Sequence, residues 1–235
     1  MKNIAILSII LMASTLFSAT NEEIIAHFKS RIPVPNLKIK VVSRKSVSDT
    51  LDYVSLFLTN GEDSQKISVF TSAEYIFPDV IDIKSGISLR DKMKREQTNK
   101  NISKVYKKEA KKNIISLGND PKKETLVIFS DPECPFCKKE LSKIESELKK
   151  VNIKMLFTPV HDKSSLEKSA LIYKYTKNAK NDSEKIKVLR KYFNQEIDEK
   201  VSSKEVQRID RLRQKYFKAG INGTPYKVME KDITQ

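Results

Sequence analysis

The sequence of 235 residues has few of the residues that build disulfide-held or metal-rich proteins: two cysteines, two histidines and no tryptophan. Two cysteines cannot supply the several disulfides that hold a very small extracellular fold together. Five glycines and eight prolines exclude a collagen-like or low-complexity chain. With 39% hydrophobic and 32% charged residues, the composition predicts a globular chain of one large domain or two modest ones.

Acidic residues are outnumbered, and the net charge of +15 comes mostly from lysine. A basic balance attracts anionic partners such as nucleic acid or membrane headgroups. The lysines are spread along the whole chain, however, and no arginine-rich patch interleaved with aromatic residues stands out. We therefore interpret them as a solvated surface and expect no nucleic-acid partner.

Long hydrophobic runs are absent except for residues 4–17, which follow Lys2. This run is short for a membrane span and fits the apolar core of a signal peptide. Phe17-Ser18-Ala19 offers a cleavage site, so we expect residues 1–19 to be an export signal. A buried helix or an uncleaved anchor is the alternative. No cysteine follows the signal, which argues against lipid attachment there.

Residues 20–87 are expected to form a small α+β domain with an antiparallel sheet. A short helix is predicted at residues 21–30, with Asn21 as its cap. Several runs rich in β-forming residues follow, with a strong turn signal at Asn60-Gly61. These extended segments are residues 37–43, 50–59, 66–71, 75–77 and 80–83.

Residues 88–116 contain no proline or glycine and are dense in charge, which favours a mostly helical connector. We assign residues 88–118 to this linker helix and place the domain boundary at the loop of residues 118–123. Residues 119–235 then follow the order strand, helix, strand, helices, strand, typical of an α/β layered domain. The expected strands are 125–129, 152–160 and 226–229, and the expected helices are 134–150, 164–194 and 202–218.

Cys134 and Cys137 are separated by Pro135 and Phe136, after a predicted strand and at the start of a predicted helix. A thiolate is the reactive form of cysteine, and a helix N-terminus stabilises a negative sulfur. Proline suits the first helical position, because its missing N–H would have no partner there. We therefore expect Cys134 to be an exposed nucleophile. Cys137, one helical turn later, would resolve the mixed disulfide that Cys134 forms.

Two other interpretations of the cysteine pair remain open. A zinc site needs four ligands, and only His27 and His161, both isolated in the sequence, could supply the others. A purely structural disulfide would close a very short loop and remove little chain entropy. We expect no metal and no cofactor, and interpret each histidine as a surface or packing residue.

Two segments resemble a known family. Residues 129–138 read Phe-Ser-Asp-Pro-Glu-Cys-Pro-Phe-Cys-Lys and resemble the active-site stretch of the bacterial periplasmic disulfide isomerases DsbC and DsbG. Residues 220–225, Gly-Ile-Asn-Gly-Thr-Pro, resemble the cis-proline loop of those proteins. The resemblance implies a thioredoxin fold in which Pro225 is cis and faces the cysteines, and the Thr224 backbone pairs with a bound substrate chain. Threonine before this proline is the isomerase-type pattern, whereas DsbA oxidases more often have valine.

The resemblance extends over most of the chain. Residues 20–87 are similar to the N-terminal dimerisation domain of the family, and the connector is similar to its linker helix. This implies a periplasmic, V-shaped homodimer with residues 80–83 near the dimer strands. It also implies misfolded or disulfide-containing exported proteins as substrates and a DsbD-like membrane reductant as partner. Only ten residues follow Pro225. The last strand and helix of the family are therefore expected to be missing, and its second disulfide is absent.

The residues and the resemblance together favour a thiol:disulfide interchange protein that isomerises or reduces non-native disulfides. A DsbA-like dithiol oxidase is the first alternative, because proline and an aromatic residue between the cysteines do not exclude it. A non-enzymatic chaperone or binder of anionic surfaces, resting on the net charge, is the second.

Overall fold

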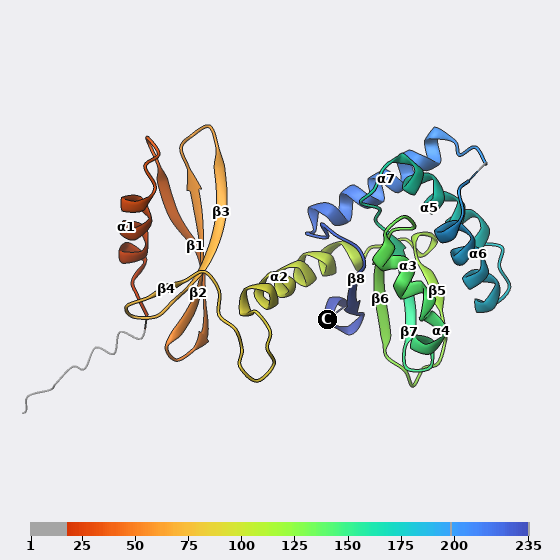
Figure 1. Ribbon diagram of the computed structural model, residues 1–235, viewed down its shortest axis with the longest axis horizontal. Helices are drawn as coiled ribbons and strands as arrows, with labels where there is room; N and C mark the ends of the chain where they lie inside the picture. The colour runs from red at the N-terminus through yellow and green to blue at the C-terminus, as the bar shows by residue number, and fades with distance from the viewer. Residues whose placement is uncertain (1–17, 198, 235) are drawn as a thin grey trace, which may run out of the picture. The chain divides into compact units, whose positions relative to one another are not determined.

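A computed structural model describes residues 18–197 and 199–234 (Figure 1). Nearly all of the expected signal peptide, residues 1–17, lies outside the described residues, so that expectation stays a prediction. The chain divides into two compact units, Met1–Met93 and Lys94–Gln235. Within the part of the chain that is described, no helix is both long and apolar enough to cross a membrane.

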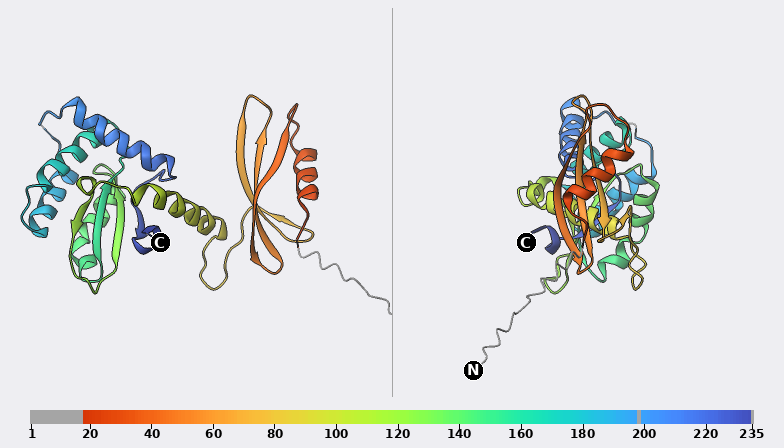
Figure 2. Two further views of the ribbon diagram at one scale, coloured as in Figure 1. Left: turned by 180° about the vertical axis from the view of Figure 1, so that it is seen from behind. Right: turned by 90° about the vertical axis from the view of Figure 1, so that its left-hand side faces the viewer.

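The N-terminal unit is a four-stranded antiparallel sheet with one helix along one face (Figure 2). Buried Ile24 on the helix packs on a small core that includes Val54, Leu56 and Val69. The strands follow one another in sequence order because each is joined to the next by a short turn or loop. The elements are α1 (Asn21–Arg31), β1 (Lys38–Ser48), β2 (Leu51–Thr59), β3 (Ser64–Thr71) and β4 (Ile76–Phe77).

The cap of α1 is Thr20, and not Asn21 as expected. The Thr20 side chain accepts a hydrogen bond from the backbone N–H of Glu23 at 3.2 Å. The Glu23 carboxylate in turn accepts from the backbone N–H of Thr20 at 2.7 Å. This reciprocal capping box satisfies two donors at the helix start, which places Asn21 inside the first turn.

Residues 80–83 do not form a strand. Ile81 makes one isolated bridge with Ser88, and a turn follows. Asp82 stabilises that turn, because its carboxylate accepts from both the backbone N–H (2.8 Å) and the hydroxyl (3.0 Å) of Ser85. A short aspartate side chain that caps its own backbone favours a turn over a strand.

The helix of the connector is shorter than the expected range of 88–118. Helix α2 (Leu89–Tyr106) ends well before it, and the 3₁₀ turn η1 (Lys111–Asn113) follows. Residues of the expected linker then form β5 (Ile115–Leu117), whose Ile115 and Leu117 are buried. The alternation of buried and exposed side chains over three residues is a strand pattern too short to see in the sequence.

The C-terminal unit contains a mixed sheet in the order β5-β7-β6-β8. Its two central strands, β6 (Thr125–Ser130) and β7 (Asn152–Phe157), are parallel, and β5 and β8 (Tyr226–Met229) are antiparallel to their neighbours. The short helix α8 (Lys231–Thr234) follows β8, and its Ile233 is buried. Tyr226–Met229 is the last strand among the described residues.

Helices cover both faces of this sheet, and successive side chains of β6 point alternately to one face and to the other. Ile128 faces a small cavity lined by α3 and α4, whereas the Phe129 ring lies 4.7 Å from that of Tyr216 on α7. The expected helix of residues 164–194 is two helices, because Asn181 caps a new one by accepting from the N–H of Glu184. The helices are α3 (Pro135–Ser142), α4 (Ile144–Leu148), α5 (Lys163–Thr176), α6 (Asp182–Asn194) and α7 (Ser203–Lys218).

Candidate functional site

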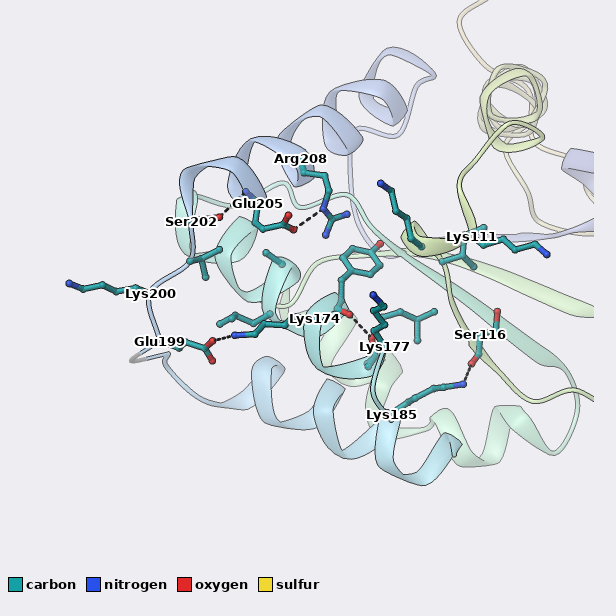
Figure 3. Close-up of a pocket in the computed structure, with 18 residues that line it drawn as sticks. Lys111, Ser116, Lys174, Lys177, Lys185, Glu199, Lys200, Ser202, Glu205 and Arg208 are labelled. Carbon is teal, nitrogen blue, oxygen red and sulfur yellow. Dashed lines mark hydrogen bonds and ion pairs between the residues drawn. The ribbon is translucent and has the colours of Figure 1, made fainter. Parts of the chain in front are cut away.

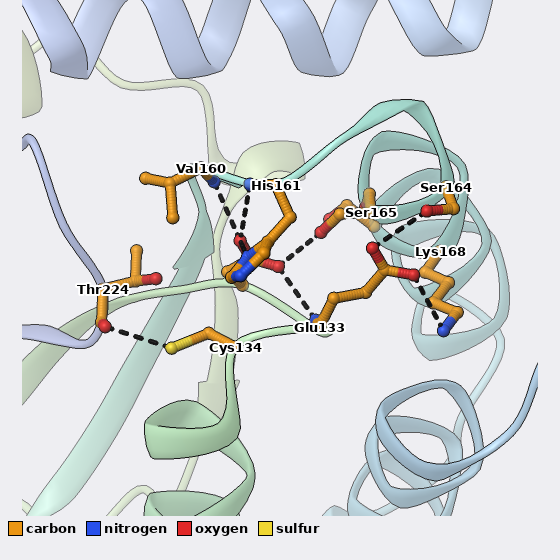
Figure 4. A network of polar contacts seen from close by, with 10 residues as sticks. Glu133, Cys134, Val160, His161, Ser164, Ser165, Lys168 and Thr224 are labelled. Atoms are coloured by element: carbon orange, nitrogen blue, oxygen red, sulfur yellow. Dashed lines mark hydrogen bonds and ion pairs between the residues drawn. The ribbon is translucent and has the colours of Figure 1, made fainter.

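Cys134 lies where β6 ends and α3 begins. It is the N-cap residue of α3, and Pro135 occupies the first turn. The Cys134 Sγ lies 3.2 Å from the carbonyl oxygen of Thr224, to which it donates (Figure 4). The Thr224–Pro225 peptide bond is cis. The structure therefore brings the two motifs of the sequence, residues 134–137 and 224–225, together.

Cys134 is less accessible than expected. Only 4% of the residue is exposed, because its sulfur faces the loop that carries Thr224. The neighbouring residue Phe136, in the first turn of α3, is 70% exposed. Phe136 therefore supplies exposed apolar surface two residues from Cys134.

Cys137 lies one helical turn further along α3 and is buried. Burial raises the pKa of the Cys137 thiol to about 11, against a smaller opposing effect of the Ser130 hydroxyl and the Asp131 backbone N–H. A thiol that holds its proton does not attack a disulfide. Cys137 therefore stays protonated near neutral pH.

Asp131 lies three residues before Cys134, and its carboxylate is completely buried. From the sequence we assigned this residue no role. It accepts hydrogen bonds from the backbone N–H groups of Glu133 (2.9 Å), Val160 (2.8 Å) and His161 (3.2 Å), and from the Ser165 hydroxyl. Burial alone would raise the pKa of Asp131, but the hydrogen bonds from Ser165 and His161, together with the backbone N–H groups, hold it below its ordinary value. Asp131 is thus an anion that fixes the loop leading into Cys134.

His161 is not isolated, as its place in the sequence suggested. Its Nδ1 lies 2.7 Å from Asp131 Oδ2. His27, by contrast, is exposed on α1 and makes an edge contact with the Phe28 ring. Across residues 18–197 and 199–234, no three side chains of the metal-binding types gather into a possible metal site.

Glu133 ties the same loop to α5. One carboxylate oxygen lies 3.0 Å from the Lys168 ammonium, which is almost fully buried, and the other accepts from the Ser164 hydroxyl at 2.9 Å. Both Asp131 and Glu133 therefore hold the loop before Cys134 through side-chain contacts with α5, and Figure 4 shows Glu133 with Ser164 and Lys168. Its partners lie about thirty residues downstream and belong to no motif, so sequence pattern alone offers no signal for them.

Comparison with solved structures finds several similar proteins. A solved structure of DsbG from Helicobacter pylori matches with a TM-score of 0.51 at 19% identity, covering 88% of this chain and 99% of the other. A linker-deleted ScsC variant from Proteus mirabilis matches at 17% identity with a TM-score of 0.43, covering 60% of this chain and 76% of the other. A disulfide interchange protein from Neisseria gonorrhoeae matches at 20% identity with a TM-score of 0.38, covering 51% and 81%.

No curated protein matches the sequence. The predicted α+β architecture is confirmed: an N-terminal antiparallel sheet, a linker helix and a C-terminal thioredoxin-like mixed sheet with helices. The model of the thioredoxin-like domain matches residues 97–232, which is more than half of the chain. These residues include both cysteines and the cis peptide bond, and the chain belongs to the thioredoxin-like domain family.

Proposed function

We propose that this protein is a thiol–disulfide oxidoreductase that isomerises or reduces non-native disulfides in exported proteins. One observation carries the proposal: the Cys134 sulfur, at the N-terminus of α3, faces the Thr224 carbonyl beside the cis peptide bond. A sulfur at this place is next to the free N–H groups of the first helical turn, which stabilise its negative charge.

In the first step, the Cys134 thiolate attacks one sulfur of a substrate disulfide. The substrate S–S bond breaks, a Cys134–substrate mixed disulfide forms, and the other substrate sulfur leaves as a thiolate that takes up a proton. We propose that the backbone of Thr224 pairs with the substrate chain during this step; the contact of its carbonyl with the Cys134 sulfur supports a substrate position beside this loop.

The mixed disulfide can then be resolved in two ways. A second substrate thiolate can attack the substrate sulfur, which releases Cys134 as a thiolate and leaves a rearranged substrate disulfide without net transfer of electrons. Alternatively, Cys137 loses its proton and attacks Cys134, which releases the reduced substrate and leaves a Cys134–Cys137 disulfide. Two electrons have then passed to the substrate, so a reductant, proposed to be a membrane partner of the DsbD kind, must restore the pair.

The high pKa of Cys137 supports the isomerising direction. A resolving thiol that keeps its proton attacks slowly, so the mixed disulfide with Cys134 persists long enough for substrate thiolates to attack it. We further propose a periplasmic location, exported through residues 1–19, and homodimerisation through the N-terminal domain of residues 20–87, with residues 88–118 as linker and 119–235 as catalytic domain.

The test is reactivation of scrambled ribonuclease by the reduced, purified protein. Wild type should restore activity in a catalytic manner, and Cys134→Ser should abolish this restoration. Ser142→Ala, a change to an exposed hydroxyl on the same helix, is the matched control and should leave it unchanged. Full activity of Cys134→Ser would overturn the proposal. Rapid oxidation of reduced ribonuclease by the disulfide form, without reactivation of scrambled ribonuclease, would favour the oxidase.

A further inference from the structure

A cavity of about 950 Å³ lies in the C-terminal unit, between the second half of α5, the segment from η1 to β5, and the start of α7 (Figure 3). Neither cysteine lines this cavity, and neither Thr224 nor Pro225 does. It is therefore a separate feature from the site around Cys134. Its volume lies within the range of pockets that bind small molecules.

The inner wall of the cavity is apolar. Ala170, Leu171 and Tyr173 from α5 and Ile115 from β5 are buried members of the main core, and Ile114 and Val201 pack against that core. Binding of an apolar group that displaces water from this wall is favourable, because it removes apolar surface from water. The wall alone would accept many ligands, so the polar groups around it decide which kind fits.

The polar groups around this wall are mainly cationic. Seven cations face only two carboxylates, and both carboxylates are already engaged. Lys174 forms an ion pair with Glu199, and the Arg208 Nε lies 2.9 Å from Glu205 Oε2. The seven cations are Lys111, Lys112, Lys174, Lys177, Lys185, Lys200 and Arg208.

Four of these cations, Lys111, Lys112, Lys177 and Lys200, have no ion pair or side-chain hydrogen bond within residues 18–197 and 199–234. Uncompensated positive charge around one cavity attracts an anion, and more strongly beside an apolar wall than in open water.

Arg208 adds a donor group that is already held in place. Its Nη1 donates to Asn113 Oδ1 at 2.9 Å, and its guanidinium lies over the Tyr173 ring, 5.2 Å from the ring centroid. Its Nη2 has no acceptor among the described residues. A guanidinium fixed on three sides loses little side-chain entropy when it binds a carboxylate, sulfonate or phosphate.

We propose that this cavity binds a small organic anion with an apolar body, such as a carboxylate, sulfonate or phosphate attached to an aromatic ring or aliphatic chain. The apolar body covers the wall formed by Leu171 and Tyr173, and the anionic group meets Arg208 and the lysines. A neutral ligand leaves those cations uncompensated, and inorganic phosphate leaves the apolar wall in water, so both bind more weakly.

The test uses the full chain and 1-anilinonaphthalene-8-sulfonate, an anion with an apolar aromatic body, followed by its fluorescence. Wild type should bind it, and the affinity should fall severalfold when salt rises from about 0.05 M to 0.5 M, because salt screens exposed charges. The uncharged N-phenyl-1-naphthylamine should bind at least about tenfold more weakly. Equal affinity for both probes, or no effect of salt, would overturn the proposal.

Variants and mapping locate the bound probe. The triple variant Lys111→Gln, Lys112→Gln, Lys177→Gln should bind the sulfonate about tenfold more weakly. The control triple variant Lys122→Gln, Lys149→Gln, Lys187→Gln removes the same charge from exposed positions outside the cavity and should bind as wild type. In methyl NMR spectra of wild type, the probe should shift the Ile114, Leu171 and Val201 signals. Shifts confined to other methyl groups, or equal weakening in both triples, would overturn the proposal.

Discussion

The His161 Nδ1 lies 2.7 Å from Oδ2 of Asp131, and the carboxylate of Asp131 is completely buried. The two residues are thirty positions apart and belong to the loops that follow β6 and β7. The parallel pairing of those strands places both loops at the same edge of the sheet, beside Cys134. The contact therefore joins the loop that carries the proposed nucleophile to the next loop along that edge.

Replacement of Asp131 by asparagine should destabilise the C-terminal unit. The side-chain amide of asparagine cannot accept from all the donors that Asp131 serves, and its NH₂ group would face N–H groups of Val160 and His161. We expect the free energy of unfolding in urea to fall by about 2–4 kcal/mol. Asp162→Asn, at an exposed residue that makes no side-chain cap bond, is the control and should change it by less than about 0.5 kcal/mol. Equal effects of the two changes would contradict this role of Asp131.

The same carboxylate should make stability depend on acid pH. Because the pKa of Asp131 is held below its ordinary value in the folded protein, its contribution to stability is complete above that ordinary value, declines as pH falls below it, and is lost as pH falls through the lowered pKa of the folded state. Wild type should lose stability as pH falls from about 5 towards 3. Asp131→Asn should show a shallower loss over this interval in urea unfolding curves. Parallel curves would show that Asp131 contributes nothing to the acid sensitivity.

Cys137 should react slowly with alkylating agents until the pH is high. With Cys134 replaced by alanine, burial remains, so the rate of Cys137 alkylation should rise about tenfold per pH unit and level off only well above the ordinary pKa of a thiol, because only the thiolate reacts. Mass spectrometry after timed iodoacetamide pulses would measure this rate. A plateau below about pH 9, at the ordinary pKa of a thiol, would contradict the effect of burial on Cys137.

Cys137→Ala should trap substrates on the protein. Without the resolving thiol, mixed disulfides with Cys134 can be released only when another substrate thiolate or an external thiol attacks them, so more of them should accumulate than in wild type. Non-reducing gels of cells that express this variant should show adducts that disappear on reduction, and mass spectrometry should find the linkage at Cys134. The double variant Cys134→Ala, Cys137→Ala is the control and should show none. Adducts that persist in the double variant would not arise from this site.

The capping box of α1 offers a test in the N-terminal unit. Thr20→Ala removes an acceptor for the Glu23 N–H and should lower the free energy of unfolding of this unit by about 1 kcal/mol. Asn21→Ala, one residue later and inside the helix, should change it by less than about 0.5 kcal/mol. Fluorescence of the tyrosines in denaturant, such as Tyr53 in β2, would follow the unfolding. A larger effect at Asn21 would restore it as the cap.

Local sequence pattern predicted an element correctly where the residues that determine it lie within the element itself. The last strand begins and ends at the predicted residues, Tyr226–Met229, and α7 begins directly after Ser202, a cap residue. The same pattern gave a wrong prediction for a short segment that could form either a helix or a strand. Ile115–Leu117 is a strand and not part of the linker helix, because it pairs with β7. The strand forms because of its pairing with a segment that is distant in the sequence, and the spacing of apolar residues within the linker does not indicate that pairing.

The sequence by itself determined that two cysteines, Cys134 and Cys137, open a helix behind a strand, because proline, turn residues and hydrophobic period act over a few neighbouring residues. Only the tertiary structure decided what surrounds them. Packing brought the Thr224 carbonyl onto the Cys134 sulfur across ninety residues and covered that sulfur. It also buried Cys137, which raises its pKa. Burial and long-range contact depend on how distant elements pack, and the spacing of residues along the chain does not contain that information.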